Sequence, residues 1–164
     1  MSTSSSTSTG VSITADPELP IIQMTRDFYA TPAQLQRAHV DPALYARWVG
    51  PTDVTTEIDH WDARSGGSWA FSNLRAGERH SFRGCFHEVR QDRLVQTFTY
   101  LGDPDGVALE TDYVRGPWRR AHPPARANAG RQLREPQRLA RERDGGRMND
   151  GYAKLDALLA AGDV

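Results

Sequence analysis

The chain has 164 residues, of which 38% are hydrophobic and 25% charged, as is usual for one soluble domain that buries a core. No apolar run has the length of a membrane span, and the Ser/Thr-rich first ten residues lack the features of a secretion signal. The single cysteine, Cys85, excludes an internal disulfide. We therefore predict a cytoplasmic protein with a disordered tail over residues 1–18 and a single domain over residues 19–164.

The N-terminal part of the domain predicts a strand followed by two short helices. Residues 21–29 are rich in β-branched and aromatic side chains, which favours a strand. Thr31-Pro32 and Asp41-Pro42 each place a capping side chain before a proline at the first helical position.

Five further strands are expected between residues 54 and 111. The windows with strand-like alternation or composition are residues 54–61, 68–74, 81–89, 94–100 and 107–111. In the first window, Val54, Thr56, Ile58 and His60 should share one face. Tight turns between consecutive strands predict an antiparallel meander.

The C-terminal end of the chain predicts a helix. Tyr152, Leu155, Leu158 and Leu159 recur at helical spacing and form an apolar stripe, and Gly162 follows as a stop. Between the meander and this helix, residues 112–147 contain ten arginines and four acidic residues without a helical or strand period. We expect this segment to be atypical and irregular.

A series of short motifs runs along the chain in a fixed order. They are Arg26-Asp27-Phe28 before Thr31-Pro32; Asp41-Pro42 with Trp48 and Gly50-Pro51; Asp62, Arg64, Gly66-Gly67, Trp69 and Phe71; and residues 82–89 and 93–97. Together they resemble the START-like, helix-grip (SRPBCC) superfamily, in particular the branch similar to the C-terminal domain of Hsp90 ATPase activators. The resemblance covers residues 21–111 and 148–160. It implies an α+β fold in which a curved antiparallel sheet wraps a long C-terminal helix, with two short helices after the first strand.

The resemblance lapses over residues 112–147, where the family has two more strands and the first half of its long helix. If the reading frame of this segment is shifted by one base, however, its possible codons can encode residues typical of the family. Trp118 before Arg119 becomes Gly, and residues 139–147 admit Trp-Leu-Ala-Ser-Gly-Met-Glu-Val-Gly, which runs directly into Met148. We infer a frameshifted segment that disrupts the last strands and the start of the long helix. A natural basic insertion is the alternative.

Aromatic side chains are the candidate ligand-binding residues. The resemblance implies a cavity between the sheet and the C-terminal helix, in which such side chains would bind an apolar or aromatic small molecule. The candidates are Trp48, Trp69, Phe71, Phe82, Phe98 and Tyr100. For each of them a packed core is the alternative.

No catalytic or metal-binding pattern stands out. His60 and His87 fall on different predicted strands, and His80 directly precedes the strand of His87; the three lack metal-type spacing, so we expect no metal and no cofactor. Cys85 is expected to be a small buried residue of a strand and not a nucleophile. The basic segment, residues 112–147, is better explained by a shifted reading frame than as a tail that binds nucleic acid.

The sequence therefore predicts non-catalytic binding of a hydrophobic or aromatic small molecule. One alternative is an interaction protein similar to the chaperone-ATPase activators. Another is an enzyme of the polyketide cyclase or aromatase type, for which we nominate no catalytic residue. We expect neither nucleic acid nor membrane as a partner, and we leave a homodimer open.

Overall fold

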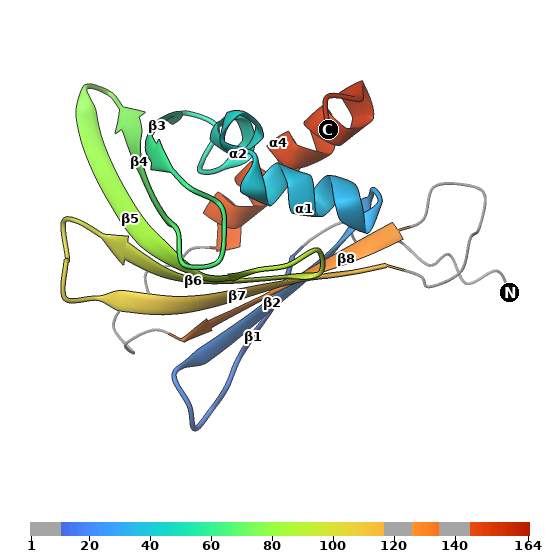
Figure 1. Cartoon of the computed structure of the whole chain (residues 1–164), viewed down its shortest axis with the longest axis horizontal. Helices are drawn as coiled ribbons and strands as arrows, with labels where there is room; N and C mark the ends of the chain where they lie inside the picture. The colour runs from blue at the N-terminus through green and yellow to red at the C-terminus, as the bar shows by residue number, and fades with distance from the viewer. Residues whose placement is uncertain (1–10, 117–125, 135–144) are drawn as a thin grey trace, which may run out of the picture.

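One curved antiparallel sheet forms the main layer of the protein, and helices cover part of its concave side (Figure 1). The computed structural model describes residues 11–116, 126–134 and 145–164. In these residues the strand order is β1 (Ser12–Ala15), β2 (Ile21–Tyr29), β8 (Arg126–Arg134), β7 (Val107–Arg115), β6 (Arg93–Tyr100), β5 (Glu78–Val89), β4 (Ser68–Arg75) and β3 (Thr55–Trp61). The helices are α1 (Pro32–Val40), α2 (Pro42–Trp48) and α4 (Gly145–Ala161). This arrangement confirms the predicted α+β helix-grip fold.

The two short helices begin at the predicted caps. The Thr31 hydroxyl accepts from the backbone N–H of Gln34 at 3.2 Å, and the Gln34 side chain accepts from the N–H of Thr31 at 2.9 Å. Asp41 ends α1 and caps α2, because its carboxylate accepts from the N–H of Ala43 at 2.9 Å. Both caps satisfy backbone donors that the first helical turn leaves without partners.

A bulge in β3 changes which of its side chains face the helices. The register with β4 shifts between Ile58 and His60, so that Trp61 pairs with Trp69 while His60 is exposed. The prediction that His60 shares a face with Ile58 is therefore wrong, because an extra residue in one strand inverts the alternation beyond it.

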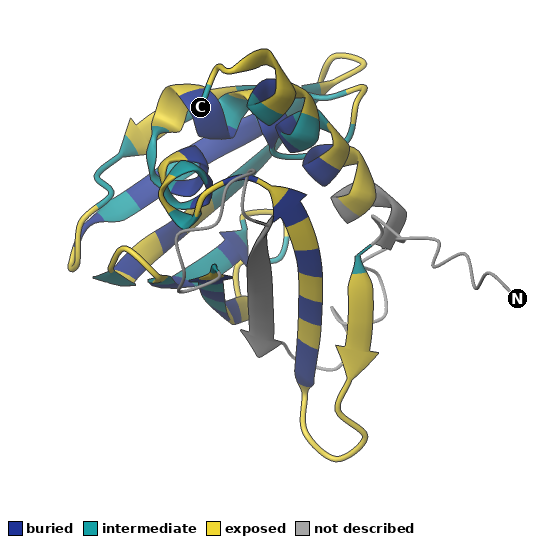
Figure 2. Cartoon of the chain, turned by 90° about the vertical axis from the view of Figure 1, so that its right-hand side faces the viewer, coloured by how far each residue is buried: buried dark blue, intermediate teal, exposed yellow. Residues whose placement is uncertain are grey.

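A short edge strand occupies part of the predicted N-terminal tail. Residues of β1 pair with β2 from Ser12 opposite Thr25 to Ala15 opposite Ile22. The prediction of a disordered tail is wrong for β1, and residues 1–10 lie outside the described part of the chain. All of β1 is exposed, whereas β2 beside it alternates between buried and exposed residues (Figure 2). Main-chain pairing holds β1, and composition does not reveal that interaction.

Regular structure also extends into the segment predicted to be irregular. β7 continues to Arg115, β8 pairs with β2 on one side and β7 on the other, and α4 begins at Gly145. The prediction is wrong for these stretches, and residues 117–125 and 135–144 lie outside the described part. A strand paired on both edges forms its backbone hydrogen bonds even when its sequence does not alternate between apolar and polar residues.

The C-terminal helix docks through its predicted apolar stripe. Tyr152, Leu155 and Leu158 are buried in the main core, and Leu159 packs against it. The Tyr152 ring lies 5.3 Å from the Phe28 ring and stacks at 5.9 Å on Trp48. Gly162, with φ of +77°, ends the helix as expected. The predicted C-terminal helix is confirmed, and its apolar stripe faces the core.

The docking of α4 can be tested by shortening the stripe. Leu155 is fully buried, so Leu155→Ala should lower the free energy of unfolding by about 3 kcal/mol. Leu159→Ala removes the same atoms from a part-buried position of the same helix and should cost markedly less. Denaturant titrations of both variants provide the measurement, and equal losses would show that α4 does not dock through Leu155.

Candidate ligand-binding site

Five of the six predicted ligand-binding residues form one continuous aromatic surface. Neighbouring rings lie 5.1 to 5.4 Å apart, because alternate residues of paired strands point to the same face of a sheet. We call this surface the aromatic floor; it consists of Trp69 and Phe71 on β4, Phe82 on β5, and Phe98 and Tyr100 on β6. The sixth residue, Trp48, lies apart on α2 and packs against His39, Tyr45 and Tyr152.

The aromatic floor is buried on one side and open on the other. Trp69 and Phe71 are each 2% exposed and belong to the core that also contains Leu155 of α4. Phe82, Phe98 and Tyr100 are only partly buried. The floor therefore begins as core next to β3 and ends as accessible aromatic surface on β5 and β6.

Gly84 makes the packing of Trp69 possible. A Cβ at Gly84 would lie 2.5 Å from Cε2 and Cζ2 of Trp69 and 2.1 Å from the carbonyl oxygen of Thr97. Gly84 is the register partner of Trp69, and because it has no side chain the indole can pack directly over it and contact Phe98. A glycine inside a strand often marks such a close approach.

Buried polar side chains lie on the same face of the sheet, and sequence reasoning missed them. Glu110 of β7 is almost fully buried and accepts a hydrogen bond from Gln96 of β6 at 2.9 Å. Asp112, two residues farther along β7, is also buried. The available signal was the alternation of Ala108, Glu110, Asp112 and Val114, which extends the strand pattern past the point where we expected it to stop.

Arg26 of β2 connects the sheet to α4. Its guanidinium donates to the carboxylate of Asp156 at 2.6 Å and to the backbone carbonyl of Tyr152 at 3.1 Å. It also lies 4.6 Å from the centre of the Phe28 ring. Arg26 is buried, whereas Asp156 is partly exposed. Removal of the Asp156 carboxylate would therefore leave the buried charge of Arg26 without this ion pair, which is destabilising.

A lysine fixes the other side of α4. The ammonium group of Lys154 donates to the carbonyl of Pro51 at 3.1 Å. Burial of this group lowers the pKa of Lys154, and the carboxylates of Asp150 and Asp53 oppose the shift.

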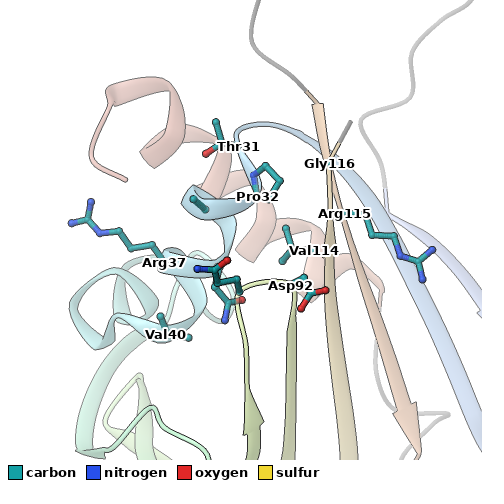
Figure 3. Close-up of a pocket in the computed structure, with 11 residues that line it drawn as sticks. Thr31, Pro32, Arg37, Val40, Asp92, Val114, Arg115 and Gly116 are labelled. Carbon is teal, nitrogen blue, oxygen red and sulfur yellow. The ribbon is translucent and has the colours of Figure 1, made fainter. Parts of the chain in front are cut away.

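A separate cavity of about 860 Å³ lies between α1 and the end of β7 (Figure 3). Its apolar wall comes from Pro32, Ala33, Val40 and Val114, and its other lining residues are Thr31, Gln36, Arg37, Gln91, Asp92, Arg115 and Gly116. The side chains of Arg37 and Arg115 extend to opposite sides of this cavity in Figure 3. It contains none of the six predicted residues.

The remaining candidates stay without a role. Cys85 is exposed on β5, so the prediction of a buried residue is wrong, while its place in a strand is right. Adjacent strand residues face opposite sides, and the inward position is taken by Phe86. Among the described residues, no three His, Cys, Asp or Glu side chains gather as a metal site would require.

Comparison with known proteins identifies the family. Residues 29–115, more than half of the chain, match the model of the family described as Activator of Hsp90 ATPase homolog 1-like protein. The chain belongs to this family. The match ends three residues past Asp112, where the sequence pattern changes. No curated protein matches the chain.

Solved structures similar to this Hsp90 ATPase activator-like chain share its fold. A Rhodobacter sphaeroides protein is 20% identical, with a TM-score of 0.79 over 92% of this chain and 99% of the other. An Arthrobacter aurescens protein is 18% identical, with a TM-score of 0.79 over 92% and 91%. A Silicibacter pomeroyi protein described as AHSA1 is 19% identical, with a TM-score of 0.68 over 87% and 99%. Within the described ranges, no helix is both long and apolar enough to cross a bilayer.

The role of Gly84 can be tested by adding one methyl group. Gly84→Ala should displace the Trp69 indole, lower the free energy of unfolding by about 1–3 kcal/mol and change the near-ultraviolet circular dichroism. Cys85→Ala, next to it on the exposed face, should leave both properties unchanged. A Gly84→Ala protein with wild-type stability and spectrum would contradict the packing described above.

Proposed function

We propose that this protein binds a hydrophobic, aromatic small molecule on the aromatic floor, in the space between the sheet and the helices, without catalysing a reaction. One observation carries the proposal. Phe82 contacts both Phe98 and Tyr100 on the face that carries the core, yet all three remain partly exposed. Aromatic side chains that face the helix layer without being covered by it offer apolar area for a ligand to bury.

Ring geometry supports an aromatic ligand in particular. The floor presents several rings at centroid distances of 5.1 to 5.4 Å and varied inclination. A further ring that joins such a cluster gains about 0.5–1.5 kcal/mol per favourable pair beyond the burial of its area. Membership of the family agrees with the proposal, since the helix-grip resemblance implies a cavity between sheet and helix.

The cavity beneath α1 is a weaker location for such a ligand. Its volume lies within the range of small-molecule sites. However, its lining includes two arginines, one aspartate and two glutamines, and none of its described lining residues is aromatic. An apolar ring would leave several of these polar groups without water, which is unfavourable. The aromatic floor is therefore the better site.

The proposal predicts that binding and stability respond to different phenylalanines. Phe82→Leu and Phe98→Leu should each weaken the binding of naphthalene by about three- to tenfold, because each removes one ring partner. Phe86→Leu is the matched control, since Phe86 is buried in the core; it should lower the melting temperature and leave binding unchanged.

Equilibrium dialysis with naphthalene and a thermal melt of each variant provide the two measurements. Equal binding by wild type, Phe82→Leu and Phe98→Leu would remove the aromatic floor as the site.

A second candidate function rests on the description of the matched family, which suggests an interaction protein that stimulates a chaperone ATPase. If this holds, adding the chain to Hsp90 should raise its rate of ATP hydrolysis in proportion to complex formation. Ligand binding alone predicts no change in that rate. A steady-state ATPase assay, with heat-denatured chain as the control, separates the two candidates.

A further inference from the structure

The three tryptophans in the described part of the chain differ in what their indole N–H groups do. Nε1 of Trp48 donates to the carbonyl of Ala38 at 2.9 Å, and Nε1 of Trp61 donates to the carbonyl of Val40 at 2.8 Å. Nε1 of Trp69 is buried, and no atom in the described part of the chain accepts a hydrogen bond from it. Buried indole N–H groups usually have an acceptor, so this donor requires an explanation.

The surroundings of Trp69 explain why it has no acceptor. Its indole contacts other rings, with Phe98 at 5.1 Å, Phe71 at 5.2 Å and Trp61 at 6.3 Å between centroids. Gly84 beneath it has no side chain, and the carbonyls at the end of α1 are taken by the other two tryptophans. The protein thus keeps a hydrogen-bond donor within an apolar surface, an arrangement that is unfavourable until an acceptor arrives.

We propose that Nε1 of Trp69 donates a hydrogen bond to the bound molecule, and that this molecule is an uncharged aromatic compound with an acceptor oxygen, such as an aryl ketone. The inference rests on the proposed function and specifies its ligand class. Binding opens the cluster of rings around Trp69, so that the ligand stacks on Phe82 and Phe98 and its oxygen meets the indole N–H.

The composition of the floor argues against a charged ligand. Trp69, Phe71, Phe82 and Phe98 have no ionisable group in their side chains, and Gly84 has no side chain. A carboxylate or phosphate placed there would lose its hydration without a cation to replace it, which is far more costly than burying a carbonyl. A neutral acceptor matches the buried indole donor of Trp69.

The decisive experiment compares two probes of similar shape, naphthalene and 2-acetylnaphthalene, of which only the second carries an acceptor. Their dissociation constants are measured by equilibrium dialysis with wild type, Trp69→Phe and Trp61→Phe. Trp69→Phe keeps an aromatic ring and removes the N–H, so it should weaken binding of the ketone about tenfold more than binding of naphthalene. Trp61→Phe removes an N–H that already has an acceptor and should change both constants by the same factor.

A second measurement does not depend on the folding of a variant. In wild-type protein, the indole N–H proton resonance of Trp69 should move downfield with 2-acetylnaphthalene and not with naphthalene, while those of Trp48 and Trp61 stay in place. If both probes bind wild type but Trp69→Phe affects them equally and the resonance does not distinguish them, Trp69 is not the donor. The floor itself is tested separately, by Phe82→Leu and Phe98→Leu. If neither probe binds wild type, both the donor and the proposed function are overturned.

Discussion

Burial of one face of α4 against the sheet is the interaction on which the rest of the structure depends. Leu155 and Tyr152 complete a core whose other side is formed by Phe28 of β2 and Trp48 of α2. Most of the stability of a helix in a protein comes from the packing of its apolar face, so these contacts hold α4 in its helical form. Arg26 adds direction, because its hydrogen bonds to Asp156 and to the Tyr152 carbonyl fix where along β2 the helix lies.

The aromatic floor is a consequence of this docking. In the described residues the sheet curves through eight strands, and the helices contact β2, β3, β7 and β8 more than the strands between them. Phe82 of β5 and Phe98 and Tyr100 of β6 are left partly exposed, while Trp69 and Phe71 of β4 belong to the core, as does Phe86 of β5. The aromatic floor thus contributes to the core at one end and offers ligand contacts at the other. The role of each ring depends on how far it lies from the helices.

Function in this family cannot be inferred from the fold alone, since one fold supports many activities. What distinguishes this chain is the chemistry of its concave face: an aromatic surface with one buried donor, and the hydrogen-bonded pair of Gln96 and Glu110 on neighbouring strands. Both features lie on the inward side of the sheet, where a low local dielectric strengthens hydrogen bonds and raises the cost of groups without partners. Buried polar groups make a site selective, because a ligand that cannot form hydrogen bonds with them leaves them without partners.

Local signals in the sequence determined most of the secondary structure. The caps at Thr31 and Asp41, the strand windows and the stripe on α4 depend on neighbouring residues, which the sequence shows directly. The bulge in β3, the pairing of β1 and the extension of β7 depend on main-chain partners far along the chain, and side-chain patterns carry little information about those. Aromatic residues could be identified as candidates, but only the curvature of the sheet and the position of the helices decided which of them are core and which stay accessible. The free donor of Trp69 belongs to the tertiary structure alone, because a donor lacks a partner only when every neighbour in space fails to accept from it.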